Sequence, residues 1–370
     1  MGRTEPSVGQ PPASFRRDAR SKKAKVTINQ LIPSLLPTHP RARRGIEAAE
    51  LIVNPPLQKP EQSSDIRAGP RLTLRVADTL TAAHLLLNET ASPRDPASHG
   101  RKVPKVAILN MASPLSPGGG FLNGASSQEE SLCMRTTLLA SLKDEYYRLP
   151  ELGAVYTPDV LVFRDEAADE LLEKKDRWFV DCITAAMLRG PETDRNDAGR
   201  GAYANEKDRE LVVQKMKMVL RICQAKGVTK VVLGAWGCGA YGNPVGEIAA
   251  AWKKVLLPRK EGKNKNKKET WDGLDDVVFA IKDAGMAESF GAAFGDGLLQ
   301  ETPEIDEAEE DEELDPEEVQ RQELQARIDE LELRIETTTN QQVKSGLCSI
   351  RSGLISQLAK GQVVDYVDEF

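Results

Sequence analysis

Glu129 and Glu130 follow Gln128 in the first half of this 370-residue chain, and seven residues separate Gln128 from the triplet Gly118-Gly119-Gly120. Three consecutive glycines let the backbone adopt left-handed conformations and bring its N–H groups close to a ligand. A helix is predicted from Ser131 to Tyr147, and a helix amino end offers free N–H donors to a phosphorylated ligand. A carboxylic acid at that place can protonate a departing hydroxyl group. These residues therefore offer backbone donors for a phosphorylated ligand beside two carboxyl groups.

The same residues also fit a purely structural role. Ser127-Gln128-Glu129-Glu130 has the form of a capping box, in which the Glu130 side chain accepts a hydrogen bond from the Ser127 amide. A glycine triplet alone indicates only a turn. From the residues alone, Glu130 is either a helix cap or a proton donor.

A second glycine-rich segment follows an apolar stretch, Val228 to Leu233, that is predicted to be a strand. Residues 234–242 read GAWGCGAYG and contain the spacing G-x-G-x-x-G over 237–242. A Rossmann dinucleotide site would need an acidic residue about 20 positions further on, at the end of the next strand. Glu261 has that distance but lies in a lysine-rich stretch with no strand before it. The segment therefore predicts a diphosphate-binding loop, with Asn243 as the N-cap of the helix that follows.

Other chemistries are disfavoured by composition. Three histidines all precede the glycine triplet, and five cysteines are far apart with no CxxC pair. These patterns argue against a histidine-based triad, a zinc centre and a disulfide framework, so we expect no metal or other cofactor. No apolar run reaches the length of a membrane span and no secretory signal is visible, so we expect a nuclear or cytoplasmic protein without membrane contact.

Predicted strands alternate with predicted helices between residues 71 and 298, and several strands are apolar throughout. This pattern indicates a three-layer α/β/α domain with a mixed sheet. The expected strands and helices cover 72–76, 79–87, 103–110, 131–147, 155–156, 160–163, 178–183, 211–225, 228–233, 245–257 and 277–281. The lysine-rich stretch 259–268 is expected to be an exposed loop.

Charge is segregated at the two ends. Residues 1–44 carry a net charge of +8, and residues 301–318 contain twelve Asp/Glu and no Lys or Arg. We expect a disordered basic tail (1–25), a helical extension (26–70) and an acidic linker (299–318) on either side of the domain. Apolar spacing in 319–370 predicts two amphipathic helices, which form a hairpin or coiled coil, bind a protein partner, or pack on the domain.

Taken together, the two glycine-rich motifs resemble those of the poly(ADP-ribose) glycohydrolases, in their microbial and fungal type. Beyond the triplet and Gln128-Glu129-Glu130, the similarity rests on residues 109–125, 156–164 and 233–244 and extends over 105–283. It implies a macrodomain-like fold and hydrolysis of the ribose–ribose O-glycosidic bonds of poly(ADP-ribose). The implied partners are that polymer and the ADP-ribosylated proteins that carry it.

The resemblance also implies residue roles. Glu130 is the implied general acid and base, Glu129 binds ribose hydroxyls, and Asn110 with Gln128 positions the distal ribose and the loop. A raised pKa is expected for Glu130, because burial beside Glu129 disfavours its charged form. Tyr241 is a candidate for covering the diphosphate, and Phe290 or Phe294 for stacking on adenine. The remaining expected contacts are Gly118, Gly119, Gly120, Gly237, Cys238, Gly239, Ala240 and Gly242.

Three other functions are weighed against this one. The chain could remove mono(ADP-ribose) or hydrolyse a related derivative, or it could bind ADP-ribose without cleaving it. A binding module needs no proton donor, so the two glutamates favour an enzyme. A scaffold role would leave both glycine-rich motifs unexplained.

Overall fold

A computed structural model describes residues 13–57, 69–90, 104–165, 170–195, 201–257 and 269–301, together with 351, 352 and 355. The chain divides into two compact units, Met1–Lys22 with Ile305–Phe370, and Lys23–Glu304. The second unit contains every candidate site residue. None of the helices within the described ranges has the length and apolar character needed to cross a membrane.

The second unit is built on a mixed sheet with strand order β1-β4-β5-β3-β8-β9-β2-β10. β4 pairs antiparallel with both β1 and β5, whereas the remaining neighbours are parallel. The strands are β1 (Glu50–Val53), β2 (Arg71–Arg75), β3 (Val106–Met111), β4 (Gly153–Val162), β5 (Trp178–Ala185), β8 (Lys230–Leu233), β9 (Asp276–Ala280) and β10 (Leu299–Glu301). Two short strands, β6 (Thr193–Arg195) and β7 (Gly201–Tyr203), pair separately.

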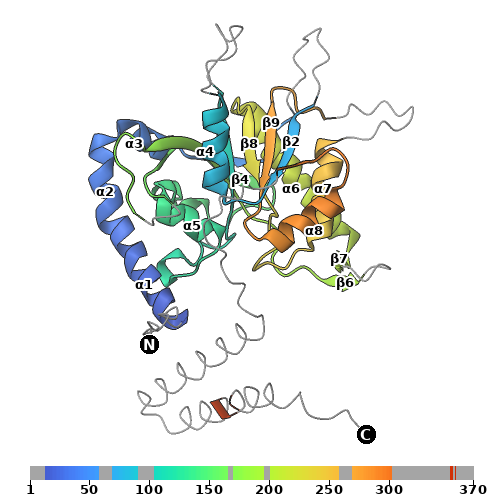
Figure 1. The fold of residues 1–370 in the computed structure, drawn as a ribbon, viewed down its shortest axis with the longest axis horizontal. Helices are drawn as coiled ribbons and strands as arrows, with labels where there is room; N and C mark the ends of the chain where they lie inside the picture. Colours follow the sequence, from blue (N-terminus) through green and yellow to red (C-terminus); the bar gives the residue numbers. More distant parts are fainter. Residues whose placement is uncertain are drawn as a thin grey trace, which may run out of the picture. The chain divides into compact units, whose positions relative to one another are not determined.

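Side chains alternate between the two faces of the parallel strands, and helices cover both faces. Val106 and Ile108 of β3 pack with α4 (Thr79–Thr90) on one face. Ala107 and Leu109 pack on the other face, with α6 (Glu206–Ala225), α7 (Val245–Leu256) and α8 (Ala284–Phe294). Figure 1 shows α4 on one side of β8, β9 and β2, and α6 to α8 on the other. The predicted three-layer α/β/α fold with a mixed sheet is confirmed.

The segment before β2 differs from its prediction. Residues 13–25, expected to be disordered, belong to helix α1 (Ala13–Val26), while residues 1–12 lie outside the described part of the chain. Ala24 has no exposed surface and packs on Phe121 and Cys133, and this burial stabilises the end of the helix. A π-helical turn, α2 (Ile32–Leu35) and α3 (Pro40–Glu47) follow as expected. The extension then continues into β1, so it is not helical throughout.

At the other end, β10 pairs with β2 and carries the domain three residues past the expected boundary at 298. Glu301 forms ion-paired hydrogen bonds with Arg75, which fixes this edge strand. The acidic residues after Glu301, the lysine-rich stretch 259–268 and nearly all of the predicted C-terminal helices lie outside the described residues.

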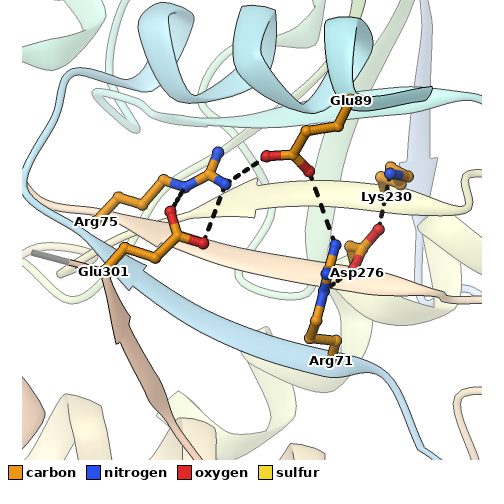
Figure 2. Close-up of polar contacts among 6 residues, drawn as sticks. All are labelled: Arg71, Arg75, Glu89, Lys230, Asp276 and Glu301. Carbon is orange, nitrogen blue, oxygen red and sulfur yellow. Dashed lines mark hydrogen bonds and ion pairs between the residues drawn. The ribbon is translucent and has the colours of Figure 1, made fainter. Parts of the chain in front are cut away.

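A charged network joins the strands at this side of the sheet (Figure 2). Lys230 of β8 donates to Asp276 of β9 at 2.8 Å, and each side chain is 9% exposed. Arg71 of β2 donates to the other oxygen of Asp276 at 2.7 Å and lies 3.7 Å from Glu89 of α4. Burial alone would raise the pKa of Asp276, but the hydrogen bonds from Lys230 and Arg71 outweigh it and hold that pKa below its ordinary value.

Asp276→Ala should lower the free energy of unfolding by about 3 kcal/mol, because it leaves the Lys230 ammonium buried without its carboxylate. Urea denaturation monitored by circular dichroism measures this loss. Glu173→Ala is the control, because Glu173 and Lys175 are 73% and 75% exposed and their pair contributes under about 1 kcal/mol. Equal losses in the two variants would contradict a stabilising role for the Lys230–Asp276 pair.

Candidate active site

Gln128 fixes the helix that carries both glutamates to the end of β3. Its side-chain oxygen accepts from the Met111 amide at 2.8 Å. Its side-chain nitrogen donates to the Leu109 carbonyl at 2.8 Å and to the Thr79 hydroxyl at 3.1 Å. Both amide hydrogens are therefore used within the protein. These contacts position the first turn of α5, and the expected role of Gln128 at the distal ribose stays a prediction.

Helix α5 runs from Gln128 to Arg135 and is shorter than the helix predicted over 131–147. Short 3-10 turns at Leu138–Ser141 and Asp144–Tyr146 replace the rest. The reason is visible at Thr136, which has extended backbone and pairs with Val162 of β4. Pairing with β4 therefore ends the helix early.

The glycine triplet wraps closely around the two carboxylates. Gly118 and Gly119 have φ values of 67° and 55°, in the left-handed region where a side chain is strained. A Cβ on Gly119 would lie 2.8 Å from Glu129 Oε2 and 3.0 Å from Glu130 Oε1. A Cβ on Gly120 would lie 2.7 Å from that of Ala125. The absence of side chains here lets the backbone approach both acids.

Glu130 is held by the loop and does not form the capping box. Its Oε1 accepts from the Gly120 amide at 2.8 Å, and its Oε2 accepts from the Ser127 hydroxyl. Ser127 is the N-cap residue but its side chain makes no capping hydrogen bond. The Glu130 side chain is therefore directed to the glycine loop, although the residue is buried with a relative exposure of 7%.

Glu129 lies deeper, with a relative exposure of 2%. Its Oε2 accepts from the Ser113 amide at 2.7 Å, and its Oε1 lies 3.4 Å from the Asn110 side-chain nitrogen. Burial raises the pKa of Glu129 to about 7, opposed by those two hydrogen bonds and assisted by the charge of Glu130. The raised pKa that the sequence predicts for Glu130 stays a prediction.

Asn110 lies at the end of β3 as predicted, beside the site, and is fully buried. Its side-chain nitrogen also lies 3.2 Å from the hydroxyl of Thr184, the residue paired with it on β5. Its side-chain oxygen has no protein partner. Asn110 is therefore placed to orient Glu129.

The second glycine-rich loop approaches the same carboxylates through Tyr241. The Tyr241 phenol lies beside the side chain of Ser113, whose amide donates to Glu129. Burial raises the pKa of Tyr241, the polar Ser113 side chain opposes the rise, and the charges of Glu129 and Glu130 add to it. Tyr241 thus connects the two motifs that the sequence places more than 100 residues apart.

The tip of this second loop presents open backbone. Gly239, Ala240 and Gly242 are exposed, and a Cβ at Gly239 or Gly242 would meet no atom within 4 Å. Gly237 and Cys238 are half-buried. Pro244 is the N-cap residue of α7, so the expected capping role of Asn243 is wrong.

The predicted adenine contact does not form. Phe290 and Phe294 are fully buried, and their rings lie 4.9 Å and 5.7 Å from that of Phe279. Both belong to the core between α8 and the sheet, because one face of that helix must bury its apolar residues. Neither ring is accessible to a base.

Ser113 and Thr184 are residues of the candidate site that the sequence patterns did not predict. Ser113 lies within the quoted motif, but its position next to Glu129 depends on the fold of the loop. Thr184 meets Asn110 through the register of β3 and β5, which no local pattern reveals. Over the described ranges, no three His, Cys, Asp or Glu residues gather as metal ligands would.

Known poly(ADP-ribose) glycohydrolases are similar to this chain in sequence and in structure. Residues 41–165 match the family model for the microbial-type PARG catalytic domain. The crystal structure of poly(ADP-ribose) glycohydrolase (PARG) from Thermomonospora curvata is 27% identical, with a TM-score of 0.56 over 75% of this chain and 98% of that one. The same enzyme bound to the inhibitor ADP-HPD matches at 27% identity over the same shares, with a TM-score of 0.52.

A variant of PARG from Deinococcus radiodurans, in complex with ADP-ribose, is 24% identical. It covers 68% of this chain and 95% of that one with a TM-score of 0.50, and at that identity it shows the fold alone. No curated protein matches the chain.

The raised pKa of Glu129 predicts a pH-dependent stability. The folded state binds this proton more tightly than the unfolded chain, whose glutamates titrate near 4.5. The resulting stabilisation, at most about 3 kcal/mol, is complete below that value and is lost as the pH rises through about 7. Glu129→Gln removes it, so the variant should gain stability relative to the wild type between pH 5 and pH 8. Chemical denaturation at both pH values measures the difference, and a pH-independent difference would contradict the raised pKa.

Proposed function

We propose, from the premise that this chain carries a microbial-type PARG catalytic domain, that Glu130 is the general acid of a poly(ADP-ribose) glycohydrolase. The reaction is hydrolysis of the ribose–ribose O-glycosidic bond with release of ADP-ribose. One observation carries the assignment: the Glu130 carboxylate accepts from the Gly120 amide inside the glycine loop and from the Ser127 hydroxyl, and not from the Ser127 amide as a capping box requires. A carboxylate used only as a cap has no reason to face that loop.

Bond cleavage requires one proton for the departing ribose oxygen and one oxygen atom from water. In the first step the Glu130 carboxyl group protonates the departing oxygen as the C–O bond breaks and positive charge develops on the sugar. In the second step the Glu130 carboxylate accepts a proton from the water that attacks this cation. The carboxyl group is thereby restored, and the reaction is balanced by the one water consumed.

Glu129 is proposed to bind ribose hydroxyls. Ser113 and Asn110 hold its side chain, and both glutamate carboxylates lie against Gly119. A sugar bound by Glu129 is therefore placed beside Glu130. Burial and the charge of Glu130 raise the pKa of Glu129 to about 7, so Glu129 can keep a proton near neutral pH and donate it to a sugar oxygen.

The exposed backbone at Gly239, Ala240 and Gly242 is proposed to receive the diphosphate, with Tyr241 covering it. Support comes from the open space around these glycines and from the Tyr241–Ser113 contact next to the acids. Gly118, Gly119 and Gly120 would face the ribose side of the ligand. ADP-ribosylated proteins would be the physiological partners. A nuclear or cytoplasmic location, and a protein partner for residues 319–370, stay predictions.

The competing functions give different products. A mono(ADP-ribosyl) hydrolase would release ADP-ribose from a singly modified protein but would not shorten a polymer. A binding module would retain the polymer intact. The pairing of a proton donor, Glu130, with the sugar-binding Glu129 favours an enzyme over a binding module, because a binding module needs no proton donor.

Glu130→Gln should reduce the release of ADP-ribose from purified poly(ADP-ribose) about a thousandfold, because an amide cannot supply the proton. Chromatography of the products measures the rate, and calorimetry with ADP-ribose shows that the ligand still binds. Glu173→Gln, on an exposed side chain, is the control. Binding of the polymer by the wild type without release would exclude the hydrolase in favour of a binding module.

Gly119→Ala should abolish most of the same activity, since its methyl group would lie 2.8 Å from Glu129 Oε2 and 3.0 Å from Glu130 Oε1. Gly227→Ala is a matched control, because Gly227 has φ of 66° but a Cβ there would meet no atom within 4 Å. Both variants should lose about 1 kcal/mol of stability from backbone strain. A similar loss of activity in both would show that strain, and not contact with the acids, is responsible.

A further inference from the structure

Asn243, which does not cap α7, is saturated with hydrogen bonds to the diphosphate loop and its surroundings. It has a relative exposure of 2%. Its side-chain nitrogen donates to the Gly237 carbonyl at 2.9 Å and to the Leu188 carbonyl at 2.8 Å. Its side-chain oxygen accepts from the Tyr203 hydroxyl at 2.8 Å. Its backbone amide donates to Gly237 as well, at 3.0 Å.

These contacts close the loop on itself. Residues 237 and 243 are joined by two hydrogen bonds to the same carbonyl, so the chain between them is held as a ring. Gly237 has φ of 80°, and a Cβ there would lie 2.6 Å from the Asn243 side-chain nitrogen. Only an amide offers two donors and one acceptor in this arrangement. An aspartate would place a carboxylate oxygen against two carbonyl oxygens.

Tyr203 connects this ring to the rest of the domain. It ends β7, which belongs to the small two-stranded sheet outside the main one. Its carbonyl accepts from Arg209 of α6 at 2.7 Å, and Arg209 forms a two-pronged ion pair with Glu247 of α7. The Tyr203 backbone is therefore held by Arg209, which links α6 to α7, and its hydroxyl donates to Asn243. The amide of Gly190 also donates to the Tyr241 carbonyl at 2.9 Å.

We propose that Tyr203 and Asn243 are positioning residues that hold the 237–242 loop in the conformation that receives the diphosphate. The inference rests on the proposed function, since it takes the ligand of that loop to be ADP-ribose. The loop reaches the acids through Tyr241, but Glu130 and Glu129 are fixed by the separate contacts to Gly120, Ser113 and Asn110. Loosening the loop thus weakens ligand binding and leaves proton transfer largely intact.

The test compares Tyr203→Phe with Tyr156→Phe. Each removes one buried phenolic hydroxyl that donates to a side-chain oxygen, since Tyr156 donates to Asp181. Tyr156 and Tyr203 have relative exposures of 3% and 2%. Asp181 forms an ion pair with Lys105, which immediately precedes β3, whereas the candidate site lies at the opposite end of that strand. The two variants differ in the place of the lost hydrogen bond and in its acceptor, which is the Asp181 carboxylate for Tyr156 and the Asn243 amide oxygen for Tyr203. The bond to the carboxylate is the stronger one, so Tyr156→Phe is the more severe change and serves as a strict control.

Both variants should lower the Tm, and Tyr156→Phe should lower it at least as much as Tyr203→Phe. Only Tyr203→Phe should raise the Kd for ADP-ribose, measured by calorimetry, and the KM for poly(ADP-ribose), each about fivefold, with kcat changed less than about twofold. An unchanged Kd in Tyr203→Phe, or an equal rise in Tyr156→Phe, would overturn the positioning role. If the wild type itself does not bind ADP-ribose, the proposed function fails first and this inference fails with it.

Asn243→Asp adds a second readout. Its carboxylate would repel the Gly237 and Leu188 carbonyls, so the Kd for ADP-ribose should rise more than tenfold at pH 8. A protonated aspartic acid donates one hydrogen bond, and affinity relative to the wild type should therefore recover in part at pH 5. A loss of affinity that is the same at both pH values would contradict the hydrogen-bond role. If this variant does not fold, the comparison of Tyr203→Phe with Tyr156→Phe still decides.

Discussion

The geometry of the site depends on burying two adjacent carboxylates within reach of backbone N–H groups. Burial of a carboxylate is unfavourable unless donors compensate it. Here the donors are the amides of Gly120 and Ser113, together with the side chains of Ser127 and Asn110. Compensation is incomplete at Glu129, and its raised pKa is the result. The backbone can come this close only because Gly119 has no side chain.

The scaffold satisfies this constraint through contacts that do not touch the acids. Gln128 hydrogen-bonds with the Leu109 carbonyl and the Met111 amide, the backbone groups on either side of Asn110. These bonds fix the first turn of α5 to the end of β3. β3 is itself a central strand, with β5 and β8 paired on its two sides. In the second glycine-rich motif, Asn243 holds the 237–242 loop through its hydrogen bonds to the Gly237 and Leu188 carbonyls. Two side-chain amides, each bound to main-chain groups and to one hydroxyl, therefore fix the two glycine-rich motifs, Gln128 the first and Asn243 the second.

The sequence predicted the layers of the fold well, because burial on both faces makes the parallel strands apolar throughout. It also predicted that Asn110, the glycine triplet and the two glutamates form one site. Asn110 lies at the end of β3, the glutamates lie in the first turn of α5, and the triplet lies in the segment between them. The sequence-based prediction was wrong where pairing between residues far apart in the chain determines the secondary structure. Thr136 leaves the helical pattern to pair with β4, and the strands expected at 155–156 and 160–163 are one strand with a register shift between Thr157 and Val160. Phe290 could not be separated from a ligand contact by spacing alone, and Asn243 had the signature of a cap.

The two edges of the main sheet carry a consequence for any shortened form of the protein. β1 and β10 are its outermost strands, and both lie outside the 71–298 boundaries that sequence patterns suggest. A fragment cut at those limits would uncover the hydrogen-bonding rows of β4 and β2. Open rows of this kind recruit strands from other molecules. Such a fragment would contain every acid and loop of the site and still be prone to aggregate, so the short strands at Glu50–Val53 and Leu299–Glu301 protect solubility.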